Sequence, residues 1–405
     1  MEEYKLSDIA EVQTGPFGSQ LHNEDYVTIG TPIVTVEHLG NRQFSKQNLP
    51  LVSDADKERL AKYILQEGDI VFSRVGSVDR CSYVSASENG WLFSGRCLRV
   101  RCGDSCYPLF LYYYFCNEPI KQYIKNIAVG ATMPSINTKL MADIPIVLPN
   151  IENQKHIAAI LSSIDDKIEL NRRINGNLEQ QAQALFKAWF VDFEPFKDGK
   201  FVDSELGKIP EDWRVSTIEE LCQHIASGST PSSMNKEYYD GNIKWFTTKE
   251  LNDTFLLDSE KHISEKGHQS SSTKMFPTGT VLMAIYAAPT VGRLGILTSN
   301  ATFNQAAVGL TPKQKIGSYY IFLLLKNERN NFNNLAIGAA QQNLSVKFVK
   351  TYTTIIPPEK VICDFNIVIN PIFDRIKFLN KEISSLTNLR DTLLPKLMSG
   401  KLKIE

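Results

Sequence analysis

The sequence has few cysteines and no long apolar run. Its seven cysteines are scattered along 405 residues, an odd number that suits free thiols in a reducing cytoplasm and argues against a disulfide framework. The longest apolar stretches, around residues 109–116 and 321–325, are far shorter than the ~18 residues of a membrane span. Residues 1–5, MEEYK, are acidic and lack the apolar core of a signal peptide. We therefore expect a cytoplasmic protein.

Net charge is nearly absent as well. Lysine and arginine total 44 against 45 aspartates and glutamates, and the resulting formal charge of −1 excludes binding to nucleic acid through bulk charge alone. A hydrophobic content of 42% excludes global disorder. The length indicates about two to four domains.

Familiar catalytic motifs are missing from the sequence. It contains no Gly-x4-Gly-Lys-Ser/Thr phosphate loop, no Gly-x-Gly-x-x-Gly dinucleotide turn and no Gly-x-Ser-x-Gly nucleophile elbow. The six histidines are not spaced as paired ligands, and Cys102 and Cys106 have no second cysteine pair or nearby histidine to complete a zinc site. We predict no metal site, and the sequence reveals no catalytic motif.

Two short segments imitate catalytic motifs. Asn370–Phe373 resembles the Asn-Pro-Pro-Tyr/Phe motif of amino-methyltransferases, but no glycine-rich cofactor strand precedes it. It lies in a helical pattern, where we expect Pro371 to start or kink the helix. Asp165–Lys167 resembles part of a nuclease acidic cluster, but here we expect a solvated helix face.

The sequence contains an internal duplication. Residues 129–132 match residues 337–340 at an offset of 208 (337 − 129), and residues 139–140 and 148–149 have matches at the same offset. Upstream, residues 67–71 match 278–282 at an offset of 211 (278 − 67), as a small loop insertion would produce. The chain therefore has the order A–B–A′–B′.

The B segments follow the heptad pattern of a coiled coil. In each segment, apolar residues alternate steps of four and three over more than four heptads. Asn171 and Asn175 place polar groups on this seam, where such residues typically fix register and pairing. The constant offset favours two rods packed on each other over two helices on separate domains. The predicted helix-pairing residues are Ile157, Leu161, Ile164, Ile168, Leu178, Leu185, Phe365, Ile369, Ile372, Ile376, Leu379, Ile383, Leu386 and Leu393.

The A segments are predicted to be mixed, β-rich globular domains. Short β-branched runs indicate strands at residues 31–36, 69–73 and 98–101, and again at 243–247, 281–284 and 307–310. Aromatic-rich helices are expected at 107–127 and 317–335, and a linker at 198–213. The predicted boundaries are 1–149 for the first domain, 150–197 for the first helix, 198–357 for the linker with the second domain, and 358–405 for the second helix.

Five segments in this layout make the chain similar to a known family. They are Leu6–Val12, Glu152–Leu161, Ala184–Phe193, Leu206–Trp213 and Leu389–Lys401. With them, the chain resembles the specificity subunit of Type I restriction–modification enzymes over essentially its whole length.

The resemblance implies an α+β protein in which two β-rich target-recognition domains are separated by two long antiparallel coiled-coil helices, with an internal pseudo-twofold repeat. Each domain would read half of a split double-stranded DNA site. The helices would dock two methyltransferase subunits, and restriction subunits would complete the complex. The chain itself would be noncatalytic and would bind no cofactor, leaving S-adenosylmethionine, ATP and Mg to the partner subunits. Helix length would then set the spacing between half-sites.

Neither domain is strongly basic. Residues 1–149 carry 14 Lys/Arg against 17 Asp/Glu, and residues 213–356 carry 14 against 10. We hypothesise that the methyltransferase subunits supply much of the phosphate contact.

Base readout requires polar side chains on loops that reach base edges. We predict such loops after the strand at 69–72, after Gly130, and at the equivalent places of the second copy; residues 15–19 and 228–232 form a further paired polar loop. Each single position fits an ordinary polar surface equally well. The candidate DNA-binding residues are Ser73, Arg74, Ser77, Arg80, Thr132, Ser135, Asn137, Lys139, Tyr286, Arg293, Gln341, Gln342, Asn343 and Lys347.

Two other interpretations remain open at this point. One is a coiled-coil scaffold that joins two protein-binding domains, and the other is a self-sufficient methyltransferase or nuclease, which the missing cofactor motifs disfavour. On the helices, Arg172, Arg173, Lys377 and Lys381 fit either partner docking or solvated charge. Trp189 and Phe190 fit either an interface or packing against a domain.

Overall fold

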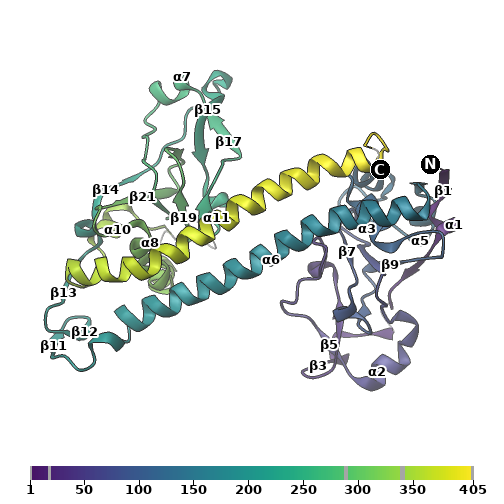
Figure 1. The fold of residues 1–405 in the computed structure, drawn as a ribbon, viewed down its shortest axis with the longest axis horizontal. Coiled ribbons are helices and arrows are strands. Elements are labelled where there is room, and N and C mark those ends of the chain that lie inside the picture. Colours follow the sequence, from purple (N-terminus) through teal and green to yellow (C-terminus); the bar gives the residue numbers. More distant parts are fainter. Residues whose placement is uncertain (1, 17–19, 287–290, 338–342, 403–405) are drawn as a thin grey trace. The chain divides into compact units, whose positions relative to one another are not determined.

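The computed structural model describes residues 2–16, 20–286, 291–337 and 343–402. The chain divides into two compact units, the first made of residues 1–168 and 385–405 and the second of residues 169–384. Two helices of 40 residues each, α6 (Ile151–Phe190) and α11 (Glu359–Met398), contribute one part to each unit (Figure 1). The boundary between the units therefore falls inside both helices, and each unit is described by itself below.

Unit 1 holds the first β-rich domain. Its main sheet has the order β2-β9-β6-β7, a second sheet has the order β3-β5-β4-β8, and β1 pairs antiparallel with β10. The strands are β1 (Glu2–Lys5), β2 (Ala10–Thr14), β3 (Tyr26–Val27), β4 (Thr31–Val34), β5 (Leu51–Val52), β6 (Ile70–Ser73), β7 (Cys81–Tyr83), β8 (Leu92–Phe93), β9 (Cys97–Cys102) and β10 (Pro145–Leu148). The helices besides α6 are α1 (Leu6–Ile9), α2 (Asp54–Arg59), α3 (Pro108–Cys116), α4 (Glu118–Ile127) and α5 (Thr138–Ala142).

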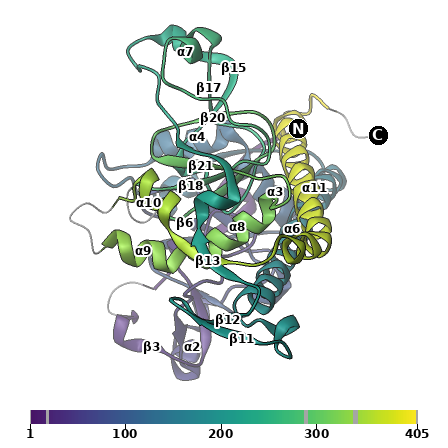
Figure 2. The ribbon, with the colours of Figure 1, turned by 90° about the vertical axis from the view of Figure 1, so that its left-hand side faces the viewer.

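Unit 2 repeats this plan. Its main sheet has the order β14-β21-β18-β19-β16, a three-stranded sheet has the order β17-β15-β20, and β13 pairs with β22. In Figures 1 and 2, β15, β17 and α7 lie together on one side of β21. The strands are β11 (Phe201–Ser204), β12 (Gly207–Pro210), β13 (Arg214–Thr217), β14 (Cys222–Ser227), β15 (Tyr239–Phe246), β16 (Thr254–Leu256), β17 (Lys261–Ile263), β18 (Val281–Ala284), β19 (Leu294–Leu297), β20 (Thr302–Phe303), β21 (Ala307–Pro312) and β22 (Thr353–Ile356). The helices besides α11 are α7 (Glu265–Gln269), α8 (Ser318–Asn327), α9 (Arg329–Ile337) and α10 (Val346–Thr351).

The order β2-β9-β6-β7 in unit 1 corresponds strand for strand to β14-β21-β18-β19 in unit 2, which confirms the duplication. The predicted strands are found at their expected places. The two aromatic-rich helices, in contrast, are each interrupted: α3 gives way to α4, and α8 to α9. Pro119 lies in the first turn of α4, where its missing N–H is tolerated, but it could not continue the helix before it.

Each unit has a core in which an aromatic helix lies between its sheet and the long helices. In unit 1, Phe110 and Phe115 on α3 are buried together with Ile157 on α6 and Leu397 on α11. In unit 2, Tyr320 on α8 packs edge-on against Phe190 of α6, with ring centroids 5.1 Å apart. Trp189 and Phe190 therefore pack against the second domain.

The two long helices pair antiparallel within each unit. In unit 1, Arg390 donates to Asp165 at 2.9 Å. In unit 2, Asn175 donates to Asn380 at 2.7 Å and Asn171 to Glu382 at 2.9 Å. Residue numbers rise along α6 as they fall along α11, which defines the antiparallel direction. Of the predicted pairing residues, Ile157, Leu161, Ile164, Ile168, Phe365, Ile369, Ile376 and Leu379 are buried, and Leu178, Leu185, Ile372, Ile383, Leu386 and Leu393 are half-buried.

The structure corrects the expectation for Asp165 and adds detail to those for Pro371 and the linker. Pro371 lies inside α11 and does not start it, and Phe373, stacked on Tyr319 at 4.4 Å, is more deeply buried than the seam residue Ile372. Asp165 is not solvated, because it accepts from Arg390 and, at 2.8 Å, from the hydroxyl of Tyr113. The linker contains the hairpin β11–β12 and ends on a buried tryptophan, Trp213.

Candidate functional site

The loop between β6 and β7 meets the segment after Gly130 in unit 1. The main-chain N–H of Ile136 donates to the carbonyl of Arg74 at 2.9 Å, and that of Gly76 donates to Pro134 at 2.8 Å. Val75 and Ser135 form an isolated antiparallel bridge between these contacts. The fold thus brings together the two groups of candidate residues that the sequence placed about sixty positions apart (135 − 75).

The same junction occurs in unit 2. Leu344 donates its main-chain N–H to the carbonyl of Ile285 at 2.8 Å, and these two residues correspond to Ile136 and Arg74 at offsets of 208 (344 − 136) and 211 (285 − 74). Tyr286 follows directly and is 39% exposed. Asn343 and Lys347 are exposed beside it, Arg293 is half-buried, and Gln341 and Gln342 lie outside the described residues.

The candidate residues of unit 1 differ in how freely they face solvent. Ser77, Thr132 and Lys139 are exposed. Asn137 is exposed but accepts from the N–H of Leu140 at 2.9 Å, which makes it the N-cap of α5. Arg80, also exposed, donates to the carbonyl of Leu39.

Three further candidates donate side-chain hydrogen bonds to main-chain carbonyl groups. Ser73 is only 2% exposed, and its hydroxyl donates to the carbonyl of Val75 at 2.7 Å. Ser135 is half-buried and donates to Val129 at 3.2 Å. Arg74 is half-buried and donates to the carbonyl of Gly95 at 3.3 Å. Because Ser73 faces the interior, we do not retain it among the residues that could reach a base edge.

In each copy, one glycine allows the main chain of the third candidate loop to approach a neighbouring main chain closely. A Cβ added to Gly15 would lie 2.2 Å from the carbonyl oxygen of Ser94, and one added to Gly228 would lie 2.1 Å from that of Phe303. Such distances leave no room for any side chain, so glycine is required for the main chains to approach. Residues 17–19 of the first loop lie outside the described residues, whereas the second loop is fixed by the indole of Trp245, which donates to Ser229 at 2.9 Å.

The electrostatics of the unit 1 junction are mildly positive. Residues 129–139 contain one lysine and no acidic residue, and the one acid of residues 74–80, Asp79, is paired with Lys125 at 3.1 Å. Deeper in the domain, Asp69 is paired with Arg101 at 2.7 Å. Arg99, 3% exposed, donates to Glu11 at 3.0 Å, and burial lowers the pKa of its guanidinium. The junction therefore presents donors without a competing acidic surface.

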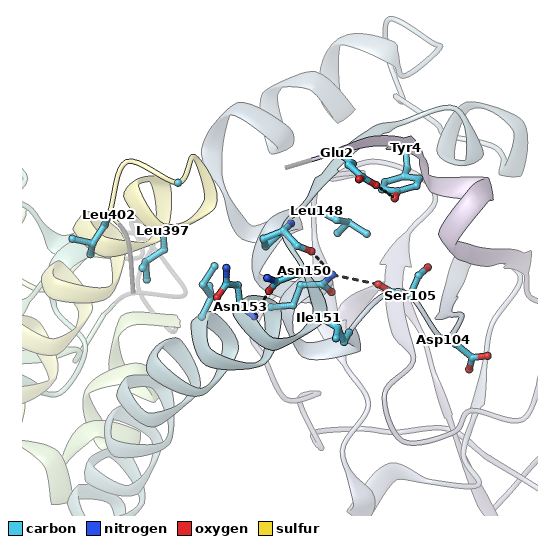
Figure 3. A pocket seen from close by; sticks show the side chains of 14 residues that line it. Glu2, Tyr4, Asp104, Ser105, Leu148, Asn150, Ile151, Asn153, Leu397 and Leu402 are labelled. Carbon is cyan, nitrogen blue, oxygen red and sulfur yellow. Dashed lines mark hydrogen bonds between the residues drawn. The ribbon is translucent and has the colours of Figure 1, made fainter. Parts of the chain in front are cut away.

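A cavity of about 860 Å³ lies elsewhere in unit 1, between β1, the start of α6 and the end of α11 (Figure 3). Gln154, one of its lining residues, accepts from the N–H of Tyr107 at 2.8 Å and donates to the carbonyl of Pro149 at 2.9 Å. Its charged lining residues within the described chain are Glu2 and Asp104, without a lysine or arginine. A phosphate group would be repelled here, so this cavity is not a candidate site for nucleic-acid contact.

The described residues contain neither a metal-binding cluster nor a helix that could span a membrane. No group of three or more His, Cys, Asp or Glu side chains there is arranged to hold a metal ion. The thiols of Cys102 and Cys106 lie 3.5 Å apart, without a histidine or second cysteine pair beside them in that part of the chain. Among the described helices, none is both long and apolar enough to cross a membrane.

The long helices expose apolar side chains that the sequence pattern did not single out. Ile160 and Leu170 on α6 are 36% and 48% exposed, and Val368 and Phe378 on α11 are 44% and 55% exposed. The two pairs are equivalent in the duplication, at an offset of 208 (368 − 160, 378 − 170). Because these residues lie outside the heptad seam, the sequence could have indicated that they are exposed. Of the outer charges, Arg172, Arg173 and Lys381 are exposed, and Lys377 lies over the ring of Phe255.

Known proteins share this organisation. The specificity subunit of the Type I restriction enzyme MjaIX from Methanocaldococcus jannaschii is 28% identical over 99% of this chain and 93% of its own length. That of HindI from Haemophilus influenzae is 26% identical over 99% of both. The crystal structure of a Type I restriction–modification S subunit from M. genitalium matches the fold with a TM-score of 0.63 at 15% identity, covering 98% of this chain and 95% of that one.

The family comparison also finds the duplication. The model of the Type I restriction modification DNA specificity domain matches residues 1–180 and matches again at residues 210–383, so that each match covers one β-rich domain together with most of the long helix after it. The chain therefore belongs to the family of the Type I restriction modification DNA specificity domain.

Proposed function

We propose that the chain is the noncatalytic, DNA-reading subunit of a Type I restriction–modification complex and that each of its two domains reads one half of a bipartite site. The observation that carries this proposal is the loop junction, which has the same main-chain hydrogen bond in both copies, Ile136 to Arg74 and Leu344 to Ile285. The main-chain hydrogen bond is repeated in the two copies while the side chains differ. This combination suits two domains that read two different DNA sequences.

Within each junction, the exposed polar side chains are the candidates for DNA contact. Ser77, Thr132 and Lys139 in the first copy, and Tyr286, Asn343 and Lys347 in the second, project from or beside loops whose main chains are hydrogen-bonded together. Lysines fit phosphate oxygens, and the amide and hydroxyl groups fit base edges or the backbone. Arg74, Arg80 and Arg293 line the same loops.

The methyltransferase subunits are proposed to dock on the outer faces of the helices. Ile160 and Leu170 on α6, and Val368 and Phe378 on α11, are exposed apolar side chains at equivalent positions of the two helices. Duplicated positions would accept two copies of one partner, because each copy would meet the same local residues. S-adenosylmethionine would then be bound by the methyltransferase subunits, and ATP and Mg by the restriction subunits that join them.

The proposal is tested by mapping methylation. The chain and its co-encoded methyltransferase are expressed together in a host that lacks adenine and cytosine methylation, and methylated positions are read by single-molecule sequencing. We expect one motif made of two specific blocks separated by an unread gap, and no methylation when this chain is omitted. Methylation that persists without the chain, or a continuous motif, would contradict the proposal.

A further inference from the structure

The segment 129–135 of unit 1 forms a tight loop whose ends are tied together. The N–H of Val129 donates to Ser135 at 2.9 Å, and the N–H of Ser135 donates back at 2.8 Å. Gly130 has a φ of +110°, and a Cβ added there would lie 2.7 Å from the carbonyl oxygen of Met133. The turn is thus closed by main-chain contacts, and the junction with Arg74 and Gly76 fixes it to the β6–β7 loop.

Two apolar side chains project from this closed loop. Met133 is 66% exposed and Val129 is 64% exposed, on either side of the exposed Thr132. Apolar surface in water is unfavourable, at roughly 25 cal/mol per Å². Because main-chain hydrogen bonds already close this loop, its exposed apolar side chains are available to a partner that would bury them.

The duplicated chain provides a comparison. Between the copies, the sequence of this segment is retained at two positions: Gly130 corresponds to Gly338 and Ile136 to Leu344, both at an offset of 208 (338 − 130, 344 − 136). Between these positions the copies differ in sequence, and Met133 corresponds to Gln341. Retained residues on both sides of a variable position are expected where that position sets sequence preference.

We propose that Met133 is a specificity-determining residue that packs against the C5-methyl group of a thymine in the half-site read by the first domain. This inference rests on the proposed function. In the major groove, the thymine methyl is the apolar group that the four unmodified bases present, so an apolar tip discriminates in favour of a T·A pair. The flexible thioether of methionine adapts readily to such an apolar contact.

The test compares Met133→Gln with Met133→Leu in the complete complex. Methylation of the host genome is sequenced for each variant, and the half-site read by the second domain serves as an internal control. With Met133→Gln, we expect the preference for T over the other bases at one position of the first half-site to fall about tenfold, equivalent to about 1.4 kcal/mol. Met133→Leu, which stays apolar, is expected to retain that preference, and the second half-site is expected to stay unchanged in both.

The possible outcomes separate this inference from the proposed function. A bipartite wild-type motif whose first half is unchanged by Met133→Gln would overturn the inference alone. So would an equal loss of methylation at all sites, because that would indicate a role in assembly. A wild-type complex without a bipartite motif would overturn the proposed function and this inference with it. Thermal unfolding of each variant checks that the exposed substitution leaves the fold intact.

Discussion

Ile136 donates its main-chain N–H to the carbonyl oxygen of Arg74 at 2.9 Å, and this hydrogen bond joins two loops that are 62 residues apart in sequence (136 − 74). Because Leu344 and Ile285 form the same contact in the second copy, each domain brings the described parts of its two candidate loops together. Each half-site can therefore be tested separately, with the other half-site as the control.

Arg74→Ala is expected to weaken recognition of the first half-site alone. An arginine that contacts a base contributes about 1–3 kcal/mol, so the methylated fraction at cognate sites should fall by tenfold or more while sequence preference relaxes in that half. Gln342→Ala is the matched change for the second half-site. Genome-wide methylation sequencing of both variants measures the effect, and unchanged motifs in both would discard the assignment of these loops.

Gly228→Ala is expected to destabilise unit 2 by about 1–3 kcal/mol, since its Cβ would overlap the carbonyl oxygen of Phe303. The matched control is Gly176→Ala on α6, where a Cβ meets nothing within 4 Å. That control should stabilise the helix by about 0.8–1 kcal/mol. Denaturant unfolding measures both changes, and effects of equal sign would show that close main-chain approach does not explain Gly228.

Thr254→Val is expected to cost about 1–3 kcal/mol, because it leaves a polar group without its partner. Asn380 on α11 donates to the hydroxyl of Thr254 at 2.6 Å and accepts from Asn175 on α6, which links the helix pair to β16. Thr254→Ser keeps the hydroxyl and should retain most of the stability. If chemical denaturation gave the same midpoint for both variants, the polar link would have no energetic role.

Lowering the pH is expected to reduce the folding stability of unit 2, because the carboxylate of Asp253 becomes protonated. Burial raises the pKa of this carboxyl, but hydrogen bonds from Arg329 and from the N–H of Leu294 outweigh it, and the net pKa is lowered. The pair therefore stabilises the fold above the unfolded pKa of about 4 and loses its contribution as pH falls through the lower folded value.

Asp253→Asn tests this dependence, because asparagine also tolerates the positive φ of 59° at this position. The slope of unfolding free energy against pH below about pH 4 should flatten in the variant. Glu237→Gln is the control, since the Glu237–Lys266 pair is exposed and should contribute little. Equal slopes in wild type and Asp253→Asn would contradict the prediction.

Phe378→Glu is expected to reduce the amount of methyltransferase that co-purifies with the chain, because a charge would replace an exposed apolar side chain at a proposed docking position. Ile29→Glu changes a residue that is 89% exposed in the first domain and should leave docking intact. Mass measurement of the assembled complex gives the number of bound subunits. A full complement with Phe378→Glu and with Leu170→Glu would place docking elsewhere.

The sequence by itself determined the duplication, the main strands and the two long helices with their seam. These features follow from periodicity, and a heptad run or a repeat at 208 residues is visible without any knowledge of distant contacts. Asn171 and Asn175 were placed on the seam for the same reason, and both are buried there.

Only the tertiary structure decided which polar residues share a surface. Ser73 and Lys139 are equally polar in sequence, yet one is buried in a turn and the other is exposed, because long-range packing and not local pattern sets exposure. The same holds for Asp165, which is held by Tyr113 and Arg390, and for Met133, whose exposure on a closed loop has no signature in the sequence. Contacts between residues far apart in the chain form only when the whole chain has folded. No local stretch of sequence therefore reveals them.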